Sequence, residues 1–222
     1  MSLNRKFPIL ILDFDGVILE SVDVKTEAFR QLFSFSPDNV DKVVSFHVEN
    51  GGMSRFDKIR YIYDNILCKS LHHDKYEYLC NRFSELVLNG VLTSNYVNGG
   101  KEFLEFFSKC TSLFLVSATP ISELMHILTQ RGLLDYFEGI YGAPRPKTEC
   151  IEEILCLSEC SEKDSIFVGD ALNDYNAAKM AGVRFIGRVK PGGINIFKDK
   201  GDVETVVPDL EELKKYLEGL YC

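Results

Sequence analysis

Three features that mark secreted, zinc-binding or membrane proteins are missing from this sequence of 222 residues. Its seven cysteines include no CxxC pair, which argues against a disulfide framework and a zinc site. The longest apolar runs, FPILIL and SLFLV, are too short to cross a bilayer. Residues 4–6 lead into a charged strand and do not resemble a signal peptide. The sequence therefore predicts a protein of the reducing cytoplasm, without a membrane span.

An excess of positive charge is also missing. The chain has 25 lysines and arginines against 33 aspartates and glutamates, a formal net charge of -8. This balance argues against nucleic acid or an anionic membrane as the main partner, but it leaves room for small anions, which respond to local charges. With 45% hydrophobic and 26% charged residues, the composition is that of an ordinary globular protein. The oligomeric state stays open, with a monomer as the simplest expectation.

Short apolar runs alternate with longer helix-like segments in most of the chain. The runs are FPILILD (7–13), SLFLVS (112–117), SIFVGD (165–170) and VRFIGRV (183–189). Helices are expected at 100–110, 120–132, 148–158, 174–182 and 208–220, and Gly132 and Gly182 are typical helix stops. Continuous apolar runs are typical of parallel strands that helices cover on both faces. The predicted fold class is therefore α/β, with a Rossmann-like parallel sheet.

A different pattern fills residues 19–96. This stretch has no convincing interior strand, but it has several aromatic-rich helical patterns. We interpret it as an α-helical cap domain inserted after the first strand. The predicted α/β core then comprises residues 1–18 and 97–222.

Polar residues of different kinds end three of the predicted strands. Asp13, Ser117 and Asp170 should meet at one edge, because the carboxyl ends of parallel strands lie together and open α/β sheets bind ligands there. Lys147 and Asp174 are candidates for the same rim. The sequence thus predicts a crevice with three or more aspartates, one serine and one lysine.

Clustered carboxylates of this kind require a cation, because they otherwise raise one another's pKa values. A set of oxygen ligands suits Mg²⁺ better than zinc. The metal and Lys147 would cancel enough negative charge for Asp13 to attack a phosphate as a nucleophile. Asp15 could serve first as general acid and then as general base, and Gly16 allows the chain to turn sharply from the strand.

Four ordered motifs carry a family resemblance: Asp13-Phe14-Asp15-Gly16-Val17, Ser117 after an apolar strand, Lys147, and Gly169-Asp170-Ala171-Leu172-Asn173-Asp174. The set resembles the four motifs of the haloacid dehalogenase superfamily. Segment 19–96 resembles the C1-type helical cap of its phosphoglycolate phosphatase and β-phosphoglucomutase branch. The resemblance implies a magnesium-dependent phosphatase that hydrolyses a small phosphorylated metabolite, such as a sugar phosphate or a phosphoglycolate-like compound.

The same resemblance implies a role for each motif residue. Asp13 would form a phosphoaspartyl intermediate, and Asp15 would be acid/base and a metal ligand through its backbone carbonyl. The remaining implied roles are phosphate binding by Ser117, Lys147 and the backbone amides of Ala118 and Thr119, and Mg²⁺ binding by Asp13, Asp170 and Asp174.

Four alternative functions use similar residues or the same fold. Dehalogenases of the superfamily lack the second aspartate of the first motif, so Asp15 favours phosphoryl transfer. A β-phosphoglucomutase-like phosphomutase would use the same aspartyl phosphate and return the phosphate to a bound sugar. A phosphoacceptor receiver domain resembles one compact domain, without a helical insertion or a GDxxxD after the lysine. A phosphate-binding protein without turnover would not need intact acids in the motifs.

The predicted cap should select the substrate. Ser54 and Asp57 fit a capping box at the start of an amphipathic helix. Arg55 would then lie in the first helical turn, where the helix dipole disfavours a cation, so a contact with a substrate anion is expected. Glu20 and Lys25 are further candidates for substrate or gate residues, although many relatives have histidine where Lys25 stands. No role is assigned to the four histidines, His47, His72, His73 and His126, which we expect at the surface or partly buried.

Overall fold

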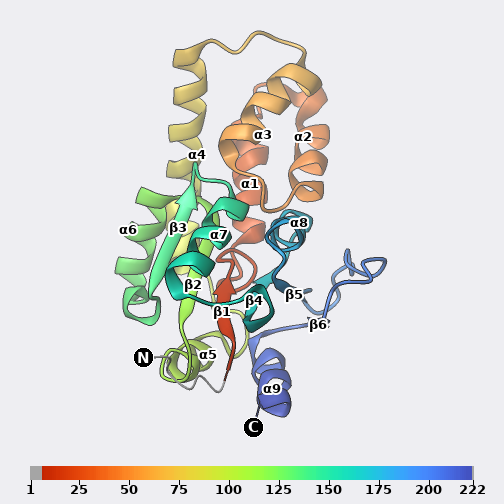
Figure 1. Ribbon diagram of the computed structural model, residues 1–222. Coiled ribbons are helices and arrows are strands. Elements are labelled where there is room, and N and C mark those ends of the chain that lie inside the picture. Colours follow the sequence, from red (N-terminus) through yellow and green to blue (C-terminus); the bar gives the residue numbers. More distant parts are fainter. Residues whose placement is uncertain (1–6, 222) are drawn as a thin grey trace.

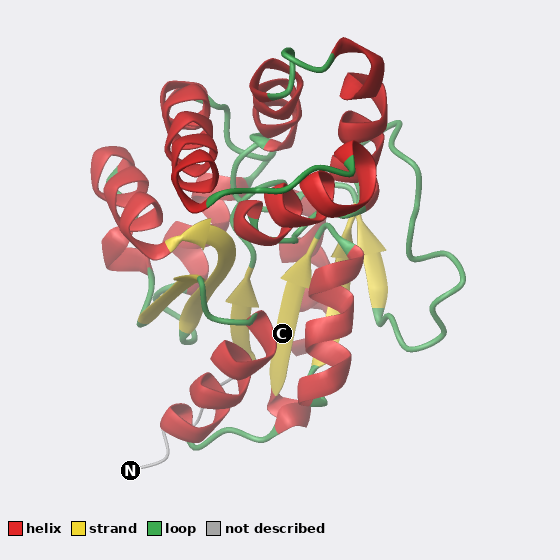
Figure 2. Cartoon of the chain, turned by 90° about the horizontal axis from the view of Figure 1, so that it is seen from above, coloured by secondary structure: helices red, strands yellow, loops and turns green. Residues whose placement is uncertain are grey.

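A six-stranded parallel sheet forms the centre of the protein, for which a computed structural model describes residues 7–221. The strand order is β3-β2-β1-β4-β5-β6, and every neighbouring pair is parallel (Figures 1 and 2). The strands are β1 Ile9–Leu12, β2 Leu113–Pro120, β3 Gly139–Ala143, β4 Ser165–Gly169, β5 Arg184–Arg188 and β6 Thr205–Val207. From β1 the chain first adds β2 and β3 on one side of the sheet and then β4, β5 and β6 on the other. Such a reversal makes the carboxyl ends of β1 and β4 the expected place for a ligand.

Helices cover both faces of this sheet, as the continuous apolar runs predict. Leu10 and Leu12 of β1 belong to one apolar cluster, and Ile9 and Ile11 belong to the other. The first cluster contains residues of α5 (Gly100–Phe107), α6 (Ile121–Arg131) and α9 (Leu210–Tyr221), and the second contains residues of α7 (Lys147–Ser158) and α8 (Leu172–Ala181). The α/β fold class is therefore confirmed.

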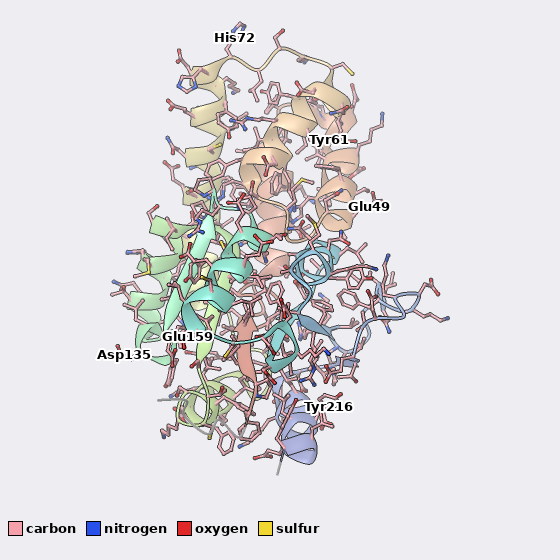
Figure 3. The ribbon with its side chains drawn as sticks, in the orientation of Figure 1. Glu49, Tyr61, His72, Asp135, Glu159 and Tyr216 are labelled. Atoms are coloured by element: carbon pink, nitrogen blue, oxygen red, sulfur yellow. The ribbon has the colours of Figure 1, made fainter. Side chains whose placement is uncertain are left out.

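Between β1 and β2 the chain forms a helical insertion, residues 22–93. It contains α1 (Val22–Leu32), α2 (Pro37–Glu49), α3 (Arg55–Tyr61), a π-helical turn (Ile62–Leu67) and α4 (His73–Thr93). Figure 1 places these helices beyond the end of the sheet to which the strands point. In Figure 3, Glu49 lies at the end of the insertion near α8, whereas His72 lies at its far end. Buried side chains of the insertion join those of the sheet in one apolar cluster.

Local signals for helix ends agree with the structure. The Ser54 side chain accepts a hydrogen bond from the Asp57 amide and caps α3, as predicted. Gly132 and Gly182 end α6 and α8 in the left-handed conformation.

The structure also contains two strands that the sequence did not predict. The edge strands β3 and β6 are short and carry few of the large apolar side chains that mark β1 and β4. Strand β2, which was predicted, continues three residues beyond Ser117, to Pro120.

No helix of residues 7–221 is both long and apolar enough to span a membrane. Residues 4–6, used for the signal-peptide prediction, lie outside the described residues.

Candidate active site

Five of the predicted residues meet at the carboxyl ends of β1, β2 and β4. Asp13 follows β1, Ser117 lies in β2, Asp170 follows β4, Lys147 begins α7 and Asp174 lies in the first turn of α8. One carboxylate oxygen each from Asp13, Asp170 and Asp174 lies within 4.8 Å of the other two. The sheet topology thus assembles residues that are far apart in the sequence.

Lys147 connects two of these carboxylates. Its ammonium donates hydrogen bonds to Asp13 Oδ1 at 2.8 Å and to Asp174 Oδ1 at 2.6 Å. All three side chains are almost fully buried. Burial alone would lower the pKa of Lys147, but Asp13 and Asp174 outweigh it and raise this pKa, so the lysine remains charged.

A close contact between β4 and α8 fixes the position of Asp174. The Ala171 amide donates to Asp174 Oδ2 at 3.0 Å, which leaves Oδ1 for Lys147. A Cβ atom at Gly169 would lie 2.3 Å from the Cβ of Asp174, so only glycine allows this approach. The GDxxxD motif therefore has a structural reason for its glycine as well as for its acids.

Negative charge exceeds positive charge in this cluster. Burial raises the pKa of Asp13 to about 7, against the effect of Lys147 and with further increases from Asp174 and Asp15. Burial and the neighbouring Asp13 and Asp174 raise the pKa of Asp170 well above its usual value. Hydrated oxygen sites of this kind suit Mg²⁺, and a cation would restore the carboxylates to their ionised form. The donor set therefore fits a divalent metal.

Asp15 has a different environment, although it lies only two residues after Asp13. Lys25 forms an ion pair with it, the Thr119 hydroxyl donates to its Oδ2 at 3.0 Å, and the Ser21 hydroxyl donates to its Oδ1 at 2.6 Å. Burial would raise the pKa of Asp15, but Lys25 and these hydroxyls outweigh it and lower the pKa. The two aspartates of the first motif thus have pKa values shifted in opposite directions.

The end of β2 supplies the residues predicted to bind phosphate. Ser117 and Ala118 line the same cavity as Asp13 and Asp15. The Thr119 amide donates to Ser117 Oγ at 3.1 Å, and the Thr119 hydroxyl is held by Lys25 and Asp15. The Thr119 amide therefore already has a partner within the chain, and phosphate binding by these groups remains a prediction.

Gly16 allows the Asp13–Asp15 segment to turn close to Asp170. It has a φ of +78°, and a Cβ there would lie 2.1 Å from Asp170 Oδ2. We expect Gly16→Ala to lower kcat/KM by about 10²-fold, because displacement of a reacting group by about 1 Å costs that much. Gly132→Ala is the matched control, since Gly132 also has a positive φ (+64°) but no atom within 4 Å of a Cβ there.

Thermal denaturation and steady-state kinetics of both variants would separate backbone strain from the contact with Asp170. Each variant should lose about 1 kcal/mol of stability through its left-handed backbone. Only Gly16→Ala should lose activity. Equal activities of the two variants would show that the contact between Gly16 and Asp170 has no role in positioning.

A cavity of about 280 Å³ lies between the sheet edge and the helical insertion. On the sheet side it is lined by Asp13, Asp15, Ser117, Ala118 and Asp170. On the side of the insertion it is lined by residues of α1, α2, α3 and α4, and by the loop after α2. Asn173 of α8 also donates to the Gly52 carbonyl at 2.9 Å, so this loop contacts the α/β core directly. The cavity can thus enclose a small molecule next to the aspartates.

The three predicted cap residues have different surroundings. Arg55 lines the cavity, but both terminal nitrogens of its guanidinium donate to Glu123 of α6, at 2.8 and 2.7 Å. Lys25 lines the cavity and holds Asp15. Glu20 accepts two hydrogen bonds from Arg188 and is not among the cavity residues. A contact of these three side chains with a substrate therefore remains a prediction.

Two buried residues of the cavity wall were not identified from the sequence. Lys58 is 2% exposed and His47 is 6% exposed, and they contact each other. The expectation that His47 lies at the surface or partly buried is therefore wrong. Lys58 stands three residues after Arg55, on the same face of α3, and this spacing could have indicated it.

Comparisons with known proteins place this geometry in a family. The haloacid dehalogenase-like hydrolase family matches residues 10–188. Phosphoglycolate phosphatase 1 of Pseudomonas aeruginosa is 24% identical over 190 residues, which cover 79% of this chain and 67% of the relative.

Solved structures share the fold at lower identity. A hydrolase from Pseudomonas syringae has a TM-score of 0.80 and 17% identity, over 97% of this chain and 100% of that one. A Bacillus subtilis protein assigned to the HAD hydrolases, solved with bound magnesium and described as revealing interdomain movement, has a TM-score of 0.71 and 17% identity. That match covers 95% of this chain and 98% of the other. The family match spans most of the chain and includes the aspartates, Ser117 and Lys147, so this protein belongs to the haloacid dehalogenase-like hydrolases.

Proposed function

We propose that the protein is a Mg²⁺-dependent phosphomonoesterase that hydrolyses a small phosphorylated metabolite through a phosphoaspartyl intermediate on Asp13. One observation carries the proposal: three carboxylates and Lys147 converge beside a cavity, with Asp15 in a separate hydrogen-bond network. The phosphatase name of the Pseudomonas aeruginosa relative supports the same reaction class. The cytoplasm, predicted from the cysteines, remains the proposed location.

In the first step, a carboxylate oxygen of Asp13 attacks the phosphorus, and the bond between phosphorus and the leaving-group oxygen breaks. Lys147 holds the Asp13 carboxylate through Oδ1, which leaves Oδ2 for the attack. Ser117 and the amides of Ala118 and Thr119 bind the phosphoryl oxygens, and the Thr119 amide gives up its hydrogen bond to Ser117 Oγ to do so. Asp13, Asp15, Asp170 and Asp174 would hold Mg²⁺, which supplies positive charge for the encounter between the carboxylate and the phosphate dianion.

Asp15 transfers protons in both steps. It gives a proton to the leaving oxygen in the first step and takes one from the water that hydrolyses the acyl phosphate in the second. Because Lys25, Thr119 and Ser21 favour its ionised form, this arrangement suits the second step. Protonation of Asp15 for the first step requires that Lys25 moves away, which a shift of α1 would produce.

The helical insertion would act as a cap over the cavity, with residues 19–96 as the cap and residues 1–18 and 97–222 as the core. Arg55 of the insertion and Glu123 of the core form a nearly buried ion pair across this boundary. A substrate anion could replace Glu123 at Arg55 when the cap closes over the ligand. Arg188, bound to Glu20 and to the Gly16 carbonyl, holds the segment that connects the two parts.

A phosphomutase is the second candidate. It would use the same attack by Asp13 and then return the phosphate to a bound sugar. The helical insertion lines one side of the cavity, and the contact of Arg55 with Glu123 joins it to the core, an arrangement compatible with retention of a sugar between the two steps. Isomerisation of β-glucose 1-phosphate, measured alongside phosphate release, distinguishes the two reactions.

The direct test of the phosphatase function is phosphate release from a panel of sugar phosphates, phosphoglycolate and nucleoside monophosphates. We expect release with Mg²⁺, and we expect excess chelator to abolish it, because Asp13, Asp170 and Asp174 lie close together around a single buried lysine. Asp13→Asn serves as the blank. Release that persists equally in chelator would contradict the metal requirement.

A further inference from the structure

Lys58 of α3 is a buried cation of the cavity wall without an anionic partner. Its side-chain nitrogen lies 2.9 Å from His47 Nδ1 and donates to the His47 carbonyl at 3.1 Å. Neither partner carries a negative charge. Among residues 7–221, no carboxylate lies within ion-pair distance of Lys58.

The other cations of the same cavity have carboxylate partners. Lys25 pairs with Asp15 and Arg55 pairs with Glu123. Lys190 pairs with a third carboxylate, Asp23, at the cavity mouth. Removal of an ammonium from water without a counter-ion is strongly unfavourable, so such a residue is unusual unless a ligand supplies the missing charge.

His47 holds Lys58 as a neutral acceptor. Burial lowers the pKa of His47 to about 3, with a further decrease from Lys58, so the ring is uncharged near neutral pH. When Nδ1 accepts from the ammonium, the ring proton lies on Nε2. The ring packs on Phe29 with a centroid distance of 4.5 Å, which fixes its plane.

This arrangement leaves one donor of Lys58 for a ligand. An ammonium has three N–H donors, and His47 takes two of them. Burial, and secondarily Lys25, lower the pKa of Lys58 to about 7, although Asp170 opposes this effect. An anion bound at the third donor would hold the amine in its charged form.

We propose that Lys58, positioned by His47, binds a second anionic group of the substrate, at the cavity wall that the helical insertion forms. The substrate is then a phosphate monoester that carries a further oxyanion, either a carboxylate or a second phosphate. This inference rests on the proposed phosphatase function and specifies the substrate class of the same site. The phosphoryl group would lie at Asp13, and the second anion would lie at Lys58.

The test compares matched phosphate monoesters that differ only in their second group. Each ω-phosphooxy carboxylic acid of two to four carbons, beginning with 2-phosphoglycolate, is paired with the alcohol of equal length, beginning with 2-hydroxyethyl phosphate. A second series of diol bisphosphates separates a phosphate from a carboxylate as the second group. In the wild type, the best anionic compound should exceed its alcohol in kcat/KM by at least tenfold.

Lys58→Met should reduce the ratio of kcat/KM between the best anionic compound and its alcohol by at least tenfold, mainly through a higher KM for the anionic compound. Lys58→Arg should keep part of the ratio, because it retains the charge. Lys42→Met, which removes an exposed lysine of α2, should keep the full ratio. A ratio that is the same in the wild type and in Lys58→Met would overturn the proposal. Lys58→Gln replaces Lys58→Met if the latter does not fold.

A binding measurement separates this inference from the phosphatase function. In an Asp13→Asn background, the anionic compounds should raise the Tm more than their alcohols do, and Lys58→Met should remove the difference. If the wild type hydrolyses no compound but this difference is present, the phosphatase function fails and the anion subsite stands. If hydrolysis occurs but neither kcat/KM nor Tm distinguishes the anionic compounds from their alcohols, the proposed anion subsite is wrong and the phosphatase function still stands.

Discussion

Asp13→Asn should lower kcat by at least about 10⁴-fold, because the loss of a covalent nucleophile removes the main reaction path. The substitution is nearly isosteric and leaves Lys147 its contact with Asp174 at 2.6 Å. Asp135→Asn, at an exposed position in the 3-10 turn Leu134–Tyr136 that follows α6, is the matched control and should keep full activity. Steady-state phosphate release on the best substrate measures both variants.

The same substitution should not destabilise the metal-free protein. The pKa of Asp13 is raised from 3.8 to about 7, so the folded state holds this proton between these pH values while the unfolded state has released it. Stability therefore falls as the pH rises through this window, and Asp13→Asn should remove that part of the decrease. In chelator at pH 8, the variant should have a Tm at least equal to that of the wild type. More than a tenth of wild-type kcat in a folded variant would refute the nucleophile role.

Lys147→Met should lower kcat by about 10²- to 10³-fold, the usual effect of removing one charge-stabilising group from an active site. It removes the cation that bridges Asp13 and Asp174, so both buried carboxylates lose their hydrogen bond to a positive charge. Lys163→Met, at an exposed position, is the matched control. Kinetics at saturating Mg²⁺ measure the loss.

The stability of Lys147→Met should depend on pH more strongly than that of the wild type. Lys147 lowers the pKa values of Asp13 and Asp170, so its removal raises both pKa values further. The folded variant then resists ionisation up to higher pH, and its metal-free Tm should fall between pH 5 and pH 8 by more than the wild-type Tm does. An equal or smaller decrease would show that Lys147 does not stabilise these carboxylates.

The sequence predicted the parts of the fold that have strong local signals. The buried strands β1 and β4 are continuous apolar runs, and their ends, with Ser117 of β2, place Asp13 and Asp170 at one edge of the sheet. The edge strands β3 and β6 are short and less buried, so their sequences do not differ clearly from loops. Their order in the sheet also depends on tertiary contacts that no local pattern records.

Pairings between side chains of different helices could not be predicted. The contacts of Arg55 with Glu123 and of Lys58 with His47 join side chains from different helices, and neither pair has a recognisable spacing. The opposite pKa shifts of Asp13 and Asp15 likewise depend on which cation lies near each carboxylate. Arg55 was expected at the substrate because its position is unfavourable for the helix dipole, and the structure shows that Glu123 also compensates for this position.

Mass spectrometry of the enzyme quenched in acid during turnover detects the phosphoaspartyl intermediate itself. We expect the peptide containing Asp13 to gain the mass of one phosphoryl group, and we expect Asp13→Asn to abolish this gain. Chelator added before the substrate should also abolish it. Rapid phosphate release without any phosphorylated Asp13 peptide, or with the phosphoryl group on another residue, would contradict the role of Asp13 as the nucleophile.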